Sequence, residues 1–116
     1  MIENIRKIAL SLPETSEHPH FEKTSFRVGK KIFVTVDEQN FQACVKLSQI
    51  DQDAFSAFDT TVVYPVPNKW GNQGWTIIYL KRVSQELLKD ALTTAYCEVA
   101  PKKLSAQVST NQPENL

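Results

Sequence analysis

The chain has 116 residues, a length that fits one domain able to bury a hydrophobic core without disulfides or metals. Thirteen basic residues balance thirteen acidic ones, so the formal net charge is zero. Proteins that grip nucleic acid through its phosphates usually carry a basic excess, so any basic surface here must be local. No apolar run reaches the length of a signal peptide or a transmembrane helix, and we therefore expect a cytoplasmic protein.

The first segment has the periodicity of an amphipathic helix. Apolar residues recur at helical spacing from Ile2 to Leu12, with charged residues on the other side. Pro13 disfavours the helical conformation of the residue before it, so we expect this helix to end at Leu12. The next stretch, residues 14–23, is polar and contains Pro19, and we interpret it as a loop.

Three strands are predicted next, over residues 24–28, 31–36 and 41–47, from their β-branched, aromatic or alternating apolar residues. Gly29-Lys30 suits a tight turn between the first two strands, and the polar residues 37–40 suit a hairpin loop before the third. The three strands therefore form an antiparallel meander with one face toward the core.

A second helix is predicted to follow the meander. Ser48 is a suitable N-cap, and Asp51 stands where an acidic side chain can complete an arrangement like a capping box. The residues expected to form the buried stripe of this helix are Ile50, Ala54 and Phe58.

The second half of the chain contains two more strands and a longer helix. Residues 62–64 form a short strand that the following prolines confine to a sheet edge. Residues 68–75 form a loop with both tryptophans, residues 75–80 a strand, and residues 84–99 a helix that a proline stops two positions later.

The last residues differ from the rest in composition. Residues 105–116 are almost entirely polar and cannot bury enough apolar surface to offset the entropy of ordering them, so we expect a disordered tail after a single domain of residues 1–104. The predicted order is α-β-β-β-α-β-β-α. It indicates an α+β fold whose mostly antiparallel sheet has its helices packed on one face.

The sequence contains no phosphate-binding loop, nucleophile elbow or metalloprotease motif, so we expect neither an enzyme nor a cofactor. His18 and His20 flank Pro19 but supply too few ligands for a zinc site. His20 either packs its ring and hydrogen-bonds the loop, or acts as a base for which no partner is evident. Cys44 and Cys97 fit small buried hydrophobic residues, with a disulfide as the alternative.

Basic side chains gather at the predicted turns and strand ends. Those considered for binding are Lys23, Arg27, Lys30, Lys31, Lys46, Lys69, Lys102 and Lys103. Basic turns near exposed aromatic rings suit nucleic acid, because cations bind phosphates and flat rings stack on bases. The alternative is a set of solvated hairpin tips, with the last two lysines complementing the dipole of the preceding helix. Trp70 either covers the core as a lid or contacts a ligand.

Four motifs occur together in one order. They are HPHFEKTSFRVGKKIF from His18 to Phe33, VKLS from Val45 to Ser48, WGNQGW from Trp70 to Trp75, and VAPKKL from Val99 to Leu104. With the helix stop before Pro13, they cover the chain up to Leu104. In this arrangement the sequence resembles the MmcQ/YjbR family.

The resemblance implies a frataxin-like arrangement, also described as a double-wing DNA-binding fold, and a DNA-binding function. The positions that match the family's motifs are Phe26-Arg27, Lys30-Lys31, Lys46, the Trp70 loop and Lys102-Lys103. Glu22 departs from the pattern, because the family commonly has glycine there, and it adds negative charge beside the site.

Two functions remain open from the sequence. The first is a non-enzymatic DNA-binding protein that contacts phosphates through a local basic hairpin face. The second is a regulatory domain that holds a small anionic molecule or a peptide in a pocket near His20, Ser25, Arg27, Lys46 and Trp70. In either case we expect a monomer without a membrane partner.

Overall fold

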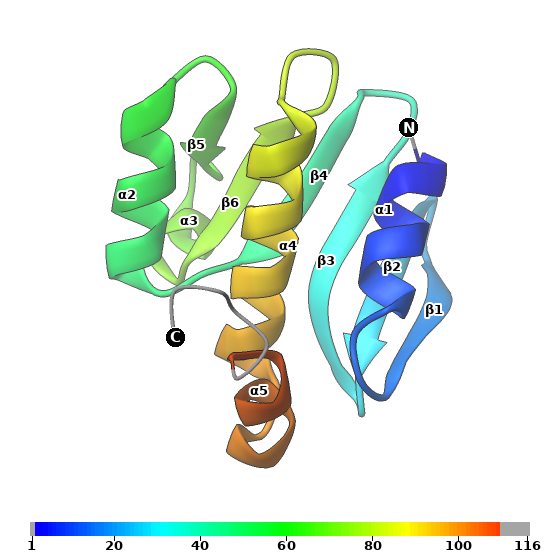
Figure 1. Cartoon of the computed structure of the whole chain (residues 1–116). Coiled ribbons are helices and arrows are strands. Elements are labelled where there is room, and N and C mark those ends of the chain that lie inside the picture. The colour runs from blue at the N-terminus through cyan, green and yellow to red at the C-terminus, as the bar shows by residue number, and fades with distance from the viewer. Residues whose placement is uncertain (1, 110–116) are drawn as a thin grey trace.

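The computed structural model describes residues 2–109 (Figure 1). Within them lie helices α1 (Ile2–Leu10), α2 (Gln49–Phe58), α3 (Lys69–Asn72), α4 (Gln85–Val99) and α5 (Lys102–Ser109). The strands are β1 (Thr15–His20), β2 (Lys23–Val28), β3 (Lys31–Asp37), β4 (Gln42–Lys46), β5 (Val63–Pro65) and β6 (Trp75–Tyr79). No helix in this part of the chain is long and apolar enough to cross a membrane.

The strands form one six-stranded sheet in the order β1-β2-β3-β4-β6-β5, and every neighbouring pair is antiparallel. Helices α1, α2 and α4 lie on the same side of this sheet (Figure 1). The predicted α+β class is therefore confirmed, and the predicted strands and long helices agree with the observed bounds to within two residues. The element order differs from the prediction by one additional strand and two additional short helices.

The core lies between the sheet and the helices α1 and α4. Phe33 and Tyr96 are both fully buried, and their rings meet edge to face with centroids 5.6 Å apart. The Tyr96 hydroxyl donates a hydrogen bond to the carbonyl oxygen of Pro13 at 2.7 Å. This bond ties the end of α1 to α4, because Pro13 stands just beyond the stop of the first helix.

The segment expected to be a loop, residues 14–23, instead contains strand β1. All six of its residues pair with β2, and only Phe21-Glu22 remain as a two-residue turn. The prediction was wrong because β1 is an edge strand with polar residues on both faces, so it lacks the apolar alternation of a half-buried strand. Proline is tolerated at such an edge, where Pro19 does not interrupt a second ladder.

Both borders of the sheet carry a proline. Pro19 lies within β1 and Pro65 ends β5, the two strands at the edges of the sheet. Proline has no N–H to donate. The row of backbone donors and acceptors along each edge strand is therefore interrupted at the proline.

Helix α2 is rotated relative to the prediction. Ser48 caps it as expected, with its hydroxyl accepting from the Asp51 N–H. However, Ile50 is 80% exposed and Phe58 is 76% exposed, whereas Gln52 is buried. The Gln52 amide donates to the carbonyl oxygen of Gly71 at 2.9 Å and to the Thr76 hydroxyl at 3.1 Å. These hydrogen bonds hold Gln52 inward, while the half-buried Phe55, three residues later, packs against the core.

The expected disordered tail begins within helix α5. Leu104 is buried and Val108 packs against the core, so the fifth helix continues the domain through Ser109. The spacing of these two apolar residues, four apart, is the helical signal within a polar stretch. The rest of the expected tail, residues 110–116, lies outside the described residues.

Candidate functional site

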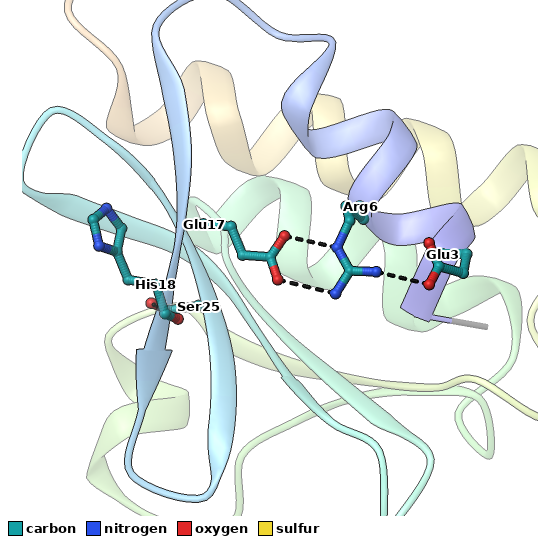
Figure 2. A network of polar contacts seen from close by, with 5 residues as sticks. All are labelled: Glu3, Arg6, Glu17, His18 and Ser25. Carbon is teal, nitrogen blue, oxygen red and sulfur yellow. Dashed lines mark hydrogen bonds and ion pairs between the residues drawn. The ribbon is translucent and has the colours of Figure 1, made fainter.

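The face of the sheet opposite the helices is defined by the strand register. Side chains of directly paired residues share a face, and successive residues alternate. Glu17 points toward Arg6 of α1, whereas His18 points to the other side of β1 beside Ser25 (Figure 2). The row that crosses the sheet from His18 therefore faces away from the helices, and it consists of His18, Ser25, Thr35, Cys44, Ile77 and Tyr64.

One hollow on this open face is bordered by both tryptophans, and we call it the tryptophan hollow. It has a volume of about 400 Å³. Its lining residues are His20, Lys23, Ile32, Thr35, Cys44, Val66, Trp70 and Trp75. Its walls are thus mainly apolar and aromatic, with one histidine and one lysine.

A second hollow of about 460 Å³ contains three lysines, and we call it the lysine hollow. Its lining residues are Lys30, Lys31, Ile32, Lys46, Trp75, Glu98 and Val99. Ile32 and Trp75 line both hollows, so the two adjoin each other on the sheet face. The structure therefore brings together the hairpin lysines and Lys46, with Trp75 between them and the tryptophan hollow.

Arg27 and Ser25 lie on the same open face but differ in what they can offer to a ligand. Ser25 is fully buried, and its hydroxyl donates to the carbonyl oxygen of His18 at 3.0 Å. The Arg27 Nε donates to the Ser25 hydroxyl oxygen at 3.3 Å. Ser25 thus positions Arg27 and the β1 backbone, whereas the remaining N–H groups of the half-buried guanidinium can meet an anion.

Trp70 does not cover the core. Its side chain is 48% exposed and lines the tryptophan hollow, and the Lys69 ammonium lies 5.5 Å from its ring centroid. The Asn68 side chain caps α3 by accepting from the Trp70 N–H at 2.9 Å. Of the two interpretations made from the sequence, the geometry favours a residue that can contact a ligand over a lid.

The two glycines of the tryptophan loop are required by close packing. A Cβ at Gly71 would lie 1.9 Å from the carbonyl oxygen of Val66. One at Gly74, whose φ is +102°, would lie 1.9 Å from the carbonyl oxygen of Leu47 and 3.2 Å from the Lys46 ammonium. The loop therefore packs directly against backbone, which fixes Trp70 and Trp75 on the sheet face.

Lys102 and Lys103 lie in the first turn of α5, not after a last helix. Positive charge at a helix N-terminus opposes the dipole of that helix, although the same lysines also follow the C-terminus of α4, which ends at Val99. Neither lines the two hollows. A further hollow of about 610 Å³ connects Lys30 and Lys31 with Pro101 and Leu104, which places the start of α5 near the hairpin.

The cysteines and histidines form no metal site. Cys44 and Cys97 are both free thiols, so the disulfide alternative does not hold. Burial raises the pKa of Cys44, which lines the tryptophan hollow, to about 11. The ring of His18 shares a hydrogen bond with the Ser16 hydroxyl at 2.8 Å. Among residues 2–109, no group of three or more His, Cys, Asp or Glu could hold a metal ion.

Sequence reasoning missed Phe21 as a surface feature. It occupies the β1–β2 turn with φ +61° and is 94% exposed, and its ring meets His20 edge to face at 5.0 Å. No sequence periodicity marks it, because the segment around it was interpreted as a loop. The one feature of the sequence that could have indicated its exposure is a large apolar residue between two polar ones, His20 and Glu22.

Comparison with known proteins agrees with this architecture. The model of the YjbR family matches residues 10–98. A search of curated proteins finds no match. The crystal structure of protein DR2400 from Deinococcus radiodurans, which contains a DUF419 domain, is similar with a TM-score of 0.76 at 19% sequence identity, over 94% of this chain and 88% of that chain.

These observations define a class of protein, a small α+β domain with a six-stranded antiparallel sheet, one face of which no long helix among residues 2–109 covers. The family match spans most of the sequence, and the chain belongs to the YjbR family.

Proposed function

We propose that this protein binds DNA through the open face of its sheet, without enzymatic activity. The observation that carries the proposal is the lysine hollow, where Lys30, Lys31 and Lys46 line one depression together with Trp75, against a single acidic residue, Glu98. Lys23 and Arg27 add positive charge from β2 on the same face. Clustered cations attract phosphates, and aromatic rings beside them contact bases or sugars.

The family resemblance supports the same proposal. It implies a frataxin-like, double-wing arrangement, in which hairpins approach DNA. The β2–β3 hairpin, with Gly29 at φ +61° and Lys30 at its tip, is the element that would approach a groove. The balanced net charge restricts binding to this local face, so we expect moderate affinity with a strong dependence on salt.

The proposal is tested by fluorescence anisotropy with a labelled duplex over a series of salt concentrations. The logarithm of the affinity should fall linearly with the logarithm of the salt concentration, by about 0.9 for each phosphate neutralised. The double variant Lys30→Ala/Lys31→Ala should make this slope shallower by about 2. Lys7→Ala/Lys89→Ala, which removes the same charge from helices α1 and α4, should leave the slope unchanged. Absence of binding to duplex and single strands at low salt would end this proposal.

The alternative, a small anionic ligand or a peptide, is favoured by the tryptophan hollow. Its volume of about 400 Å³ falls within the range of small-molecule sites, and Arg27 and Lys46 could hold a carboxylate or phosphate nearby. A ligand that binds only the folded state raises the melting temperature, so a metabolite panel measured by thermal shift separates the two functions. A metabolite that stabilises the protein while DNA does not would favour this alternative.

A further inference from the structure

The β1–β2 turn combines an unfavourable backbone conformation with an exposed aromatic ring. His20 pairs with Lys23, so Phe21 is the first of only two turn residues. Its φ of +61° lies in the region that glycine and asparagine tolerate and a bulky residue avoids. Its side chain is 94% exposed, so no burial compensates the backbone strain. Strain of this kind that packing does not explain is characteristic of functional positions.

Phe21 lies in the turn between two residues that line the tryptophan hollow. The residues on either side of the turn, His20 and Lys23, both line that hollow, and the His20 ring is in edge-to-face contact with Phe21. Trp70, the other strongly exposed aromatic residue there, reaches the same hollow from α3 in the second half of the chain. The Phe21 ring thus contacts one lining residue of the hollow, His20, whereas Trp70 lines the hollow directly. Lys23 belongs to the same lining, and Lys69 lies over the Trp70 ring.

This lining fits a flat heteroaromatic ring joined to phosphates. Ile32, Val66 and the tryptophans offer apolar contact, while His20 and the Thr35 hydroxyl offer hydrogen bonds to ring nitrogens and oxygens. The adjoining lysine hollow supplies cations next to this site, because the two hollows share Ile32 and Trp75. In duplex DNA the faces of the bases are covered by their neighbours, so only an unpaired base could enter.

We infer that the tryptophan hollow holds one unpaired base of single-stranded or locally opened DNA. Phe21 and Trp70 stack on bases, and the lysine hollow holds the flanking phosphates. This inference rests on the proposed DNA binding and names its preferred substrate: a single strand is bound more tightly than a duplex of the same length.

The test compares three ligands of about 12 nucleotides, within the range of single-strand site sizes. They are an unstructured single strand, the corresponding duplex, and a single strand in which abasic units replace the nucleotides but keep the phosphates. The single strand should bind about tenfold more tightly than the duplex or the abasic strand, since stacking contributes at this level per base. It should also quench the fluorescence of Trp70 and Trp75, the two tryptophans of the chain.

Two variants locate the effect. Phe21→Gly should weaken single-strand binding by about fivefold to tenfold with the salt slope unchanged, because it removes a ring and no charge. The same variant should raise the melting temperature by roughly 3–6 °C, because glycine relieves the strained turn, so lost affinity cannot be ascribed to unfolding. Trp70→Ala should lose affinity similarly, and Trp70→Phe, which keeps a ring, should retain most of it.

The outcomes distinguish this inference from the proposed function. If duplex, single strand and abasic strand bind equally and Phe21→Gly changes none of them, the base-binding hollow is refuted while DNA binding stands. If none of the three binds at low salt, both ideas fail. Single-strand binding that persists after Phe21→Gly and Trp70→Ala would also contradict the inference, because it would place the bases elsewhere.

Discussion

Arg6 joins helix α1 to the edge strand β1. Its Nε and Nη2 donate to the two carboxylate oxygens of Glu17 at 2.7 and 3.0 Å, and its Nη1 lies 2.9 Å from a carboxylate oxygen of Glu3 (Figure 2). The paired geometry lowers the pKa of Glu17, chiefly through the hydrogen bonds from Arg6, although partial burial opposes this. The contact matters for the open face, because Glu17 and His18 are neighbours on the same strand.

Replacing Glu17 by Gln should therefore make the stability difference from wild type depend on pH. A carboxyl whose folded-state pKa is lowered contributes stability above its unfolded pKa and loses that contribution as pH falls through the folded pKa. The melting temperature of Glu17→Gln should lie below that of wild type at pH 7, and the two should converge in acid. Glu38→Gln, which removes a charge without touching Arg6, serves as the control. A difference that persists unchanged into strong acid would contradict the ion pair.

Gly71 and Gly29 differ in the space available for an added methyl group. Gly71→Ala would place a Cβ against the Val66 carbonyl oxygen, and the required shift should destabilise the protein by roughly 2–3 kcal/mol. Gly29→Ala meets no atom within 4 Å, so its cost should be only the positive φ, about 1 kcal/mol. Urea unfolding of both variants measures the difference. Equal losses would show that the tryptophan loop is not packed as closely as described.

At the scale of elements, α2 presents its apolar stripe to solvent and its amide inward. The stripe of Ile50, Ala54 and Phe58 was predicted to be buried from its spacing alone. The spacing correctly indicated a helix. It did not indicate which side of the helix faces the core, because a polar side chain can be buried when its amide finds hydrogen-bond partners. Gln52 finds them in Gly71 and Thr76, both distant in sequence.

In an ordinary amphipathic helix, replacing an apolar residue costs more stability than replacing a polar one. At Gln52 and Ile50 of α2 we expect the reverse. Gln52→Leu should cost about 1–3 kcal/mol, since it leaves the Gly71 carbonyl and the Thr76 hydroxyl short of a partner. Ile50→Lys should change stability by less than about 0.5 kcal/mol, because the side chain is 80% exposed. Chemical denaturation of both variants checks this, and a larger loss for Ile50→Lys would reverse the assignment of the helix faces.

Strand β1 shows a second limit of sequence reasoning. The strands β2, β3, β4 and β6 were predictable because their buried faces leave a regular apolar pattern. An edge strand built from Thr, Ser, Glu, His and Pro leaves none, and only its pairing with β2 defines it. For the candidate site, the grouping of Lys30, Lys31 and Lys46 followed from the predicted meander. The role of Phe21 depended on a backbone angle that the sequence does not reveal.

At the scale of the whole molecule, the zero net charge conceals an uneven distribution. The open sheet face carries the lysine hollow, Lys23 in the adjoining tryptophan hollow, and Arg27 on β2. On the helix side, the groove of about 420 Å³ between α2 and α4 is lined by Asp51 and Asp90 together with apolar residues. The lysine hollow, which holds three lysines and Glu98, therefore differs in local charge from the groove between α2 and α4.

Chromatography can reveal this difference. At pH 7 and low salt the protein should be retained on a cation exchanger despite its formal net charge of zero, because a local patch and not the total charge meets the resin. Lys30→Ala/Lys31→Ala should elute at clearly lower salt, whereas Lys7→Ala/Lys89→Ala should elute close to wild type. Equal shifts for the two double variants would show that total charge governs retention.

The prolines at the two borders of the sheet have a consequence for how copies of this chain meet at high concentration. Amyloid growth requires that each new strand find an unbroken row of donors and acceptors on the last one. Pro19 and Pro65 interrupt that row in both exposed strands, so the sheet offers a poor template for cross-β stacking. Each edge strand thereby lacks a donor that an added strand would need, while no long helix among residues 2–109 covers the open face.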